Sequence, residues 1–108
     1  MLDYEMFHLN AENRKNGDYI KVLHPDYREF GQSGGIFKLN DFKGQPLDAN
    51  EYAVKFFEAL ELSESARLCT YTLVDKTNNV SSRRSSVWVM YNADWKLLFH
   101  QGTKVNNQ

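Results

Sequence analysis

Residues 83–105 carry the sequence RRSSVWVMYNADWKLLFHQGTKV, which predicts two β-strands joined by a tight turn. Strand residues alternate between the two faces of a sheet, and Asn and Asp are common in turns. If Asn92 and Ala93 form a two-residue turn, the residues that face each other can be paired along the hairpin. The predicted pairs on one face are Met90 with Trp95, Trp88 with Leu97, Ser86 with Phe99, and Arg84 with Gln101.

The opposite face of this hairpin also carries large apolar side chains, so neither face is typical of a plain solvent-exposed surface. One face can cover helices and a pocket, and the other is a candidate surface for a homodimer. The second face is predicted to hold Ser85, Val87, Val89, Lys96, Leu98 and His100.

Further strands are predicted upstream of the hairpin, over Glu51–Leu62 and Ala66–Asp75, with another strand from Tyr27 and a short arm over Ile36–Leu39. A first helix is predicted near the start of the chain, with Leu2, Met6 and Leu9 on its buried face, and a second from Asp18 to Pro25.

Helices therefore come first and strands afterwards, which predicts an α+β fold in a single domain over residues 1–108. We expect the N-terminal helices to pack on a strongly curved antiparallel sheet.

Composition excludes several classes of protein. Leu, Ile, Val and Phe make up 27 of 108 residues, above the roughly 20% below which chains tend to stay disordered. The net charge of −1 argues against nucleic-acid binding, which depends on a basic surplus. No apolar run approaches the roughly 20 residues that span a bilayer, and no signal peptide is expected. The single cysteine, Cys69, cannot close an intramolecular disulfide, which favours a cytoplasmic setting.

The segment His24–Gly34 and, near the other end of the chain, the stretches Arg84–Val89 and Trp95–Thr103 resemble the nuclear transport factor 2-like superfamily. More narrowly they are similar to a bacterial domain of unknown function related to the SnoaL-like proteins. The resemblance covers nearly the whole chain. It implies a cone-like α+β barrel that encloses a pocket, commonly in a homodimer. It does not imply one activity, because the superfamily includes isomerases, cyclases, dehydratases, transport factors and oligomerisation domains.

Two residues are candidates for a catalytic general base. Glu29 is the first, because Tyr27 and Phe30 beside it can exclude water from its carboxylate. The alternative is a structural carboxylate that caps backbone amides or pairs with an arginine. His100 is the second, because a histidine can carry a proton near neutral pH. Its alternative is a core or interface histidine.

The predicted ligand-binding residues combine apolar walls with a few polar groups. Arg84 can offer a two-pronged donor to an anion, and its alternative is a salt bridge to Glu29 or another carboxylate. The full predicted set is Arg84, Ser86, Trp88, Phe99 and Gln101. We expect no metal and no cofactor, because the histidines are isolated, Cys69 has no cysteine partner, and the glycines match no nucleotide-binding pattern.

Three hypotheses for the function follow. The first is binding of a small, partly apolar molecule in the cone by a homodimer. The second is a cofactor-independent isomerase, cyclase or dehydratase that uses Glu29 or His100 as the base. The third is a structural domain that dimerises and recruits another protein.

Overall fold

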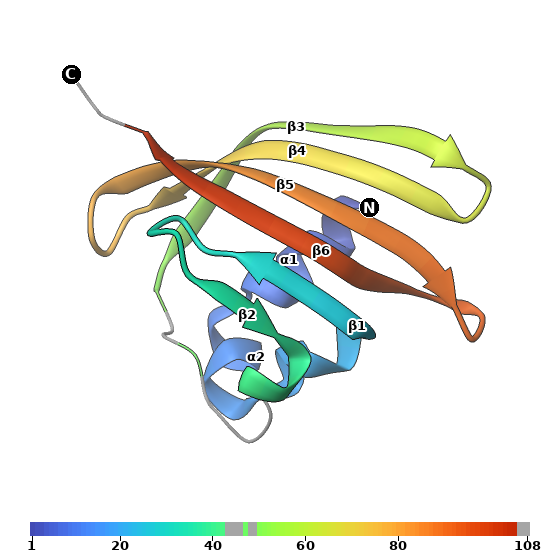
Figure 1. Cartoon of the computed structure of the whole chain (residues 1–108). Helices are drawn as coiled ribbons and strands as arrows, with labels where there is room; N and C mark the ends of the chain where they lie inside the picture. Colours follow the sequence, from blue (N-terminus) through green and yellow to red (C-terminus); the bar gives the residue numbers. More distant parts are fainter. Residues whose placement is uncertain (43–46, 48–49, 106–108) are drawn as a thin grey trace.

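The computed structural model describes residues 1–42, 47 and 50–105. The order of its elements is apparent in Figure 1. They are α1 (Leu2–Leu9), α2 (Ala11–Asn16), the 3₁₀ helix η1 (Asp18–Val22), β1 (Leu23–Phe30), β2 (Ile36–Lys38), the 3₁₀ helix η2 (Leu39–Asp41), β3 (Tyr52–Ser63), β4 (Ala66–Asp75), β5 (Val80–Tyr91) and β6 (Asp94–Val105).

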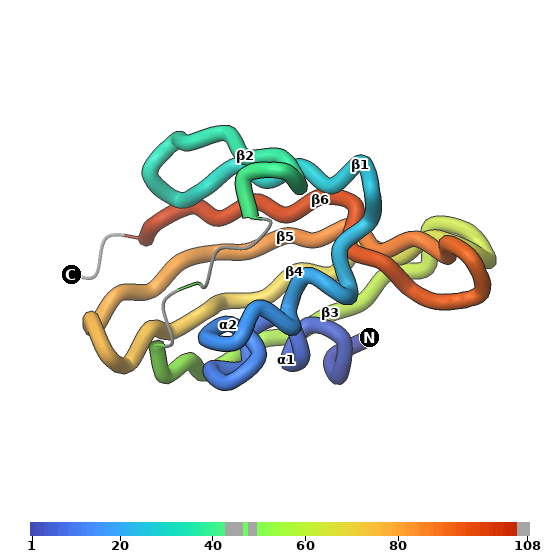
Figure 2. The backbone as a smooth tube through the Cα atoms, turned by 90° about the horizontal axis from the view of Figure 1, so that it is seen from below, coloured from blue at the N-terminus to red at the C-terminus, as the bar shows by residue number. Residues whose placement is uncertain are grey.

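The strands form one sheet in the order β2-β1-β6-β5-β4-β3. The sheet curves over the helices, and we call the side that carries them the inner face (Figures 1 and 2). The predicted α+β class, with helices packed on a curved sheet, is confirmed. The sheet is not closed, because β2 and β3 form its two edges. It is also not wholly antiparallel, since β1 pairs with β6 in the parallel direction across a long sequence separation.

The buried face of α1 differs from the predicted one. Glu5, His8 and Leu9 are buried, whereas Leu2 and Met6 are exposed. The prediction took only apolar residues as candidates for the core. Glu5 and His8, three positions apart on one side of the helix, turn inward because polar groups of the sheet receive them there.

The core lies between this sheet and the N-terminal segments. Its buried members are Tyr19, Leu23, Tyr27, Cys69, Trp88 and Leu97. Tyr19 and Leu23 come from η1 and the start of β1, where a longer second helix was predicted. Trp88 is completely buried and contributes the largest side chain of this cluster from β5.

The last hairpin contains the predicted turn but not the predicted register. Asn92 and Ala93 have positive φ angles of 49° and 65°, and Trp88 lies opposite Leu97 as expected. A bulge then places Leu98 as an extra residue in β6. Beyond the bulge, Ser86 pairs with His100 and not with Phe99, and Arg84 pairs with Gly102 and not with Gln101. His100 therefore faces inward, and Phe99 and Gln101 face outward.

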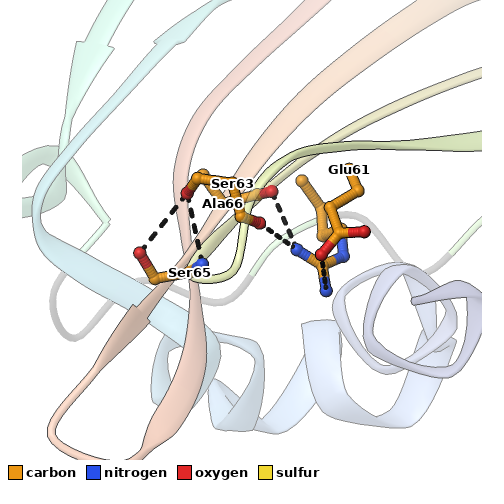
Figure 3. Close-up of polar contacts among 5 residues, drawn as sticks. Glu61, Ser63, Ser65 and Ala66 are labelled. Atoms are coloured by element: carbon orange, nitrogen blue, oxygen red, sulfur yellow. Dashed lines mark hydrogen bonds and ion pairs between the residues drawn. The ribbon is translucent and has the colours of Figure 1, made fainter.

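Arg67 holds the turn between β3 and β4 (Figure 3). Its Nη1 donates to the carbonyl oxygens of Ser63, at 2.6 Å, and Ala66, at 3.0 Å, and its Nη2 lies 3.5 Å from Oε1 of Glu61. The guanidinium also lies 4.9 Å from the ring centre of Trp95. One side chain thus links β3, β4 and β6 at this end of the sheet.

Candidate functional site

A buried carboxylate attaches α1 to the inner face of the sheet. Glu5 accepts hydrogen bonds from Nε1 of Trp88 at 2.9 Å, Oγ of Ser86 at 3.1 Å and the hydroxyl of Tyr71 at 3.2 Å. Burial raises the pKa of Glu5, while these three hydrogen bonds act in the opposite direction. The same burial, with the charge of Glu5 beside it, raises the pKa of Tyr71 well above 10.

The hydrogen bonds continue from Glu5 to an arginine. Nη1 of Arg84 lies 3.4 Å from Nε2 of His100, and Nδ1 of His100 lies 2.7 Å from Oγ of Ser86. An arginine can only donate, so Nε2 of His100 is the acceptor and its Nδ1 carries the proton. Nδ1 then donates to Ser86, whose hydroxyl is left to donate to Glu5. The four side chains form one directed chain of donors.

His8 lies beside this chain of donors. Its ring centre is 5.7 Å from that of His100, and its Nδ1 has no hydrogen-bond partner among the described residues. Burial lowers the pKa of His8 to about 3, and the charges of Arg14 and Arg84 add to this effect. Burial likewise lowers the pKa of His100 well below 6.5, so both histidines are neutral at neutral pH.

Arg84 also lines a pocket of about 310 Å³ on the inner face. Its Nε donates to Oγ of Ser82 at 2.8 Å, and its Nη2 donates to Oε1 of Gln32 at 3.0 Å. A Cβ atom on Gly102 would lie only 2.7 Å from Cζ of Arg84, so glycine provides the space for the guanidinium. The described residues that line the pocket are Arg14, Gln32, Leu47, Asn50, Tyr52, Leu73, Asp75, Asn78, Val80, Ser82 and Arg84.

No carboxylate of the described chain forms an ion pair with Arg84. Asp75 lines the same pocket, but its carboxylate accepts hydrogen bonds from Asn50 and Asn78. Of the two alternatives for Arg84, the salt bridge to Glu29 is therefore absent. The pocket holds the fixed guanidinium in a mostly polar lining, with a smaller apolar part from Leu47, Tyr52, Leu73 and Val80, which suits a small anion with an apolar part.

Apart from Glu29, the predicted site residues fall into three groups. Arg84 lines the inner pocket, and Ser86, Trp88 and His100 belong to the buried layer next to it. Phe99 and Gln101 lie on the outer face, because of the bulge at Leu98.

Glu29 is half-buried on β1 and accepts a 2.5 Å hydrogen bond from the hydroxyl of Tyr27. Burial and the charge of Glu29 raise the pKa of Tyr27. The catalytic roles of Glu29 and His100 stay predictions.

Sequence reasoning missed Glu5, His8 and Gly102. The signal for Gly102 was present, since a glycine inside a strand marks a bulge or the close approach of another group. Glu5 and His8 gave only the spacing of one helix face, which a solvent-exposed face shares. Among the described residues, no cluster of three or more His, Cys, Asp or Glu side chains could hold a metal ion. No helix in that part of the chain is long and apolar enough to cross a membrane.

No family model and no curated protein matches this sequence. Solved structures do match its fold. A nuclear transport factor 2-like protein from Cytophaga hutchinsonii is 17% identical, with a TM-score of 0.76 over 96% of this chain and 94% of that chain. A candidate ketosteroid isomerase from Parabacteroides distasonis is 12% identical, with a TM-score of 0.79 over 97% and 85%. The association domain of C. elegans CaMKII is 13% identical, with a TM-score of 0.66 over 94% and 88%.

At these identities the likeness concerns the fold alone. The narrower resemblance to the SnoaL-like branch stays a prediction.

Proposed function

Starting from the nuclear transport factor 2-like fold that this chain has, we propose that its inner pocket binds a small, partly apolar carboxylate. The observation that carries the proposal is Arg84, a cation fixed at the floor of the pocket with no carboxylate partner among the described residues. Arginine suits this role because its planar fork matches both oxygens of a carboxylate.

Three contacts hold the Arg84 guanidinium before any ligand arrives. Ser82, Gln32 and His100 each contact a different nitrogen, and the open space over Gly102 accommodates the group. A donor that is already oriented loses less side-chain entropy on binding. Leu73, Val80 and Tyr52 supply an apolar wall, and the volume of about 310 Å³ is at the low end for ligand pockets. The ligand is therefore expected to be small.

The test compares acids with neutral molecules of the same shape. Calorimetric titration with butyrate and benzoate, against butyramide and benzamide, is expected to show binding of the acids only. Arg84→Gln should weaken binding of the acids about 10- to 100-fold, the range for a lost charge-assisted hydrogen bond. Gly102→Ala should also weaken it, because the new methyl group displaces the guanidinium.

The matched control is Arg83→Gln, since Arg83 is exposed on the outer face of the same strand. Equal effects of Arg83→Gln and Arg84→Gln would show that general surface charge, and not the pocket, attracts the acids. Equal binding of acids and amides would also contradict the proposal.

A proton-transfer enzyme is the second candidate function. It is supported by His100, whose Nε2 contacts Arg84 at the pocket floor and whose Nδ1 leads through Ser86 to Glu5. Such an enzyme would move a proton beside a carbonyl with His100 or Glu29 as the base. Turnover that survives both His100→Ala and Glu29→Gln would eliminate it. A pH profile that moves with one of the two substitutions would support it.

We also propose that the chain acts as a homodimer through the outer face. Leu60, Leu68, Val87 and Phe99 are successive cross-strand partners on β3, β4, β5 and β6, and we call them the apolar row. The ring of Phe99 meets that of Phe30 at 5.2 Å. Leu60 is 57% exposed, and a contiguous exposed apolar patch indicates an interface. Light scattering at micromolar concentration should give a dimer, and a strict monomer would contradict this proposal.

A further inference from the structure

The inner pocket carries groups of opposite charge at its two ends. It lies where β4 turns into β5, on the side of the sheet that carries α2 (Figure 2). Asp75, the last residue of β4, pairs with Val80, whereas Arg84 donates to Ser82, two residues further along β5. Two residues of a strand span about 7 Å. The row of Asp75 and the row of Ser82 are therefore about 7 Å apart, a spacing that a small ligand can bridge.

Arg84 and Gln32 form the donor end of the pocket. A guanidinium has five N–H groups, and within the described chain Arg84 directs one each to Ser82, Gln32 and His100. Two N–H groups are left for a ligand. Because Oε1 of Gln32 accepts from Arg84, the side-chain group of Gln32 that can still contact a ligand is its NH2, which is also a donor.

Asp75, Asn50 and Asn78 form the acceptor end. Oδ2 of Asp75 accepts from Nδ2 of Asn50 and from Nδ2 of Asn78, each at 2.9 Å, and its Oδ1 accepts from the backbone N–H of Asn78 at 3.0 Å. Both amide NH2 groups are thus turned toward Asp75, which leaves the carbonyl oxygen of each amide as an acceptor. All three side chains line the pocket, so this end favours a ligand group that donates hydrogen bonds.

Asp75 keeps its negative charge at neutral pH. Partial burial acts to raise the pKa of Asp75, but the hydrogen bonds from Asn78 and Asn50 outweigh it and hold the pKa below 3.8. No lysine or arginine of the described chain forms an ion pair with Asp75. The other charged residues that line the pocket are Arg14 and Arg84, so a carboxylate is still attracted to it.

We infer that the ligand of the inner pocket is a small amino acid in its zwitterionic form, with its carboxylate at the donor end and its ammonium group at the acceptor end. This inference rests on the proposed function and adds a cationic group to the ligand. An ammonium group has three N–H donors, which match a carboxylate with carbonyl oxygens around it. Leu73 and Val80 line the pocket as well, which suits a short apolar side chain.

The first experiment compares ligands that share one carbon chain. Calorimetric titration with butyrate, 2-hydroxybutyrate and 2-aminobutyrate varies only the group on the second carbon. We expect 2-aminobutyrate to bind about 10- to 100-fold more tightly than butyrate, the range for hydrogen bonds to a charged group. The hydroxy acid should bind about as tightly as butyrate. 2-Aminobutyramide, which keeps the ammonium group and lacks the carboxylate, should bind more weakly than 2-aminobutyrate.

The second experiment removes the charge at the acceptor end. Asp75→Asn should abolish the preference for 2-aminobutyrate over butyrate, because the ammonium group loses its opposite charge. The matched control is Glu51→Gln. Glu51 lies just before β3 at the same end of the sheet, its side chain is 74% exposed, and it is not among the described residues that line the pocket. The preference should stay in this variant.

Asp75 also accepts hydrogen bonds within the β4–β5 turn, so circular dichroism must show that Asp75→Asn has folded. If it has not, Asn50→Ala replaces it. This variant removes one acceptor and leaves the hydrogen bonds between Asn78 and Asp75 in place. The preference for 2-aminobutyrate should then fall several-fold, and an unchanged preference would contradict the inference.

The outcomes separate this inference from the proposed function. If neither butyrate nor 2-aminobutyrate binds, or if Arg84→Gln leaves their binding unchanged, the carboxylate pocket itself is wrong. If butyrate binds in the pocket and 2-aminobutyrate binds no more tightly, the zwitterion alone is overturned. An equal loss of preference in Asp75→Asn and Glu51→Gln would also overturn it, because the effect would then come from general charge and not from the acceptor end.

Discussion

Glu5 shows how one residue can connect two layers. Its carboxylate satisfies buried donors on Trp88, Ser86 and Tyr71. Glu5→Gln keeps the size of the side chain but replaces one accepting carboxylate oxygen with an NH2 group that can only donate. At least one buried donor is then left without a partner, at a cost of about 1–3 kcal/mol. Urea unfolding should show this loss.

The control for this prediction is Met6→Ala. Met6 follows Glu5 in α1 and is 41% exposed, so its effect on the unfolding free energy should be within about 0.5 kcal/mol. If Glu5→Gln is no more destabilising than Met6→Ala, the carboxylate does not fasten α1 to the sheet.

Trp88 and Gln101 lie on opposite faces of the sheet, so their substitutions should have different effects. Trp88 is completely buried and Gln101 is exposed on the other face. Trp88→Ala should therefore lower the unfolding free energy by about 3–5 kcal/mol. Gln101→Ala should change neither this free energy nor the binding of carboxylates in the inner pocket. Thermal melts and titrations of the two variants check this, and weaker carboxylate binding by Gln101→Ala would contradict the outward position of Gln101.

At the scale of elements, Arg67 stabilises the end of the β3–β4 hairpin (Figure 3). Arg67→Ala removes two hydrogen bonds to carbonyl oxygens and a contact with the ring of Trp95. We expect a loss of about 1–2 kcal/mol, from the usual size of such contacts. Amide exchange of Met90, whose N–H donates to the Ser65 carbonyl, should become faster than that of amides at the far end of the hairpin.

Glu64→Ala tests whether the effect is specific, because Glu64 is an exposed residue of the same turn. It should leave the exchange rate of Met90 unchanged. An equal acceleration in both variants would mean that the turn, and not Arg67, limits local opening.

For the whole molecule, the buried histidines predict a loss of stability in acid. The pKa of His8 is about 3 when folded, against an ordinary value of 6.5. Its contribution is full above pH 6.5 and is lost as the pH falls towards 3, because the unfolded chain takes up the proton first. The complete loss amounts to about 4–5 kcal/mol, a large part of the 5–15 kcal/mol typical of a domain.

Glu5 acts in the opposite direction, since its folded pKa is raised and its contribution is lost as the pH rises above 4.5. Because His8 and His100 are both buried and neutral, urea unfolding should show a free energy of unfolding that decreases as the pH is lowered from 7 to 4. The His8→Phe variant should take up about one proton fewer than the wild type when it unfolds. An identical pH dependence in His8→Phe and the wild type would show that His8 titrates normally in the folded chain.

Local patterns in the sequence determined the strands, the Asn92–Ala93 turn and the α+β order, because side-chain alternation and turn chemistry depend on neighbours in the chain. The resemblance to the nuclear transport factor 2-like superfamily predicted the fold, and strand alternation correctly placed Arg84, Ser86 and Trp88 on one face. Only the tertiary structure decided the bulge at Leu98, which exchanges the positions of His100 and Phe99. A bulge shifts every residue beyond it, and the glycine of this strand, Gly102, lies four positions after the bulge and does not give its place.

The inward faces of Glu5 and His8 and the parallel pairing of β1 with β6 were likewise decided by tertiary structure. A carboxylate can be buried only where donors from distant strands meet it, and here those donors lie 66 to 83 positions further along the chain. Periodicity within a helix contains no information about such partners. The site therefore depends on contacts that form only when the first helix reaches the last three strands.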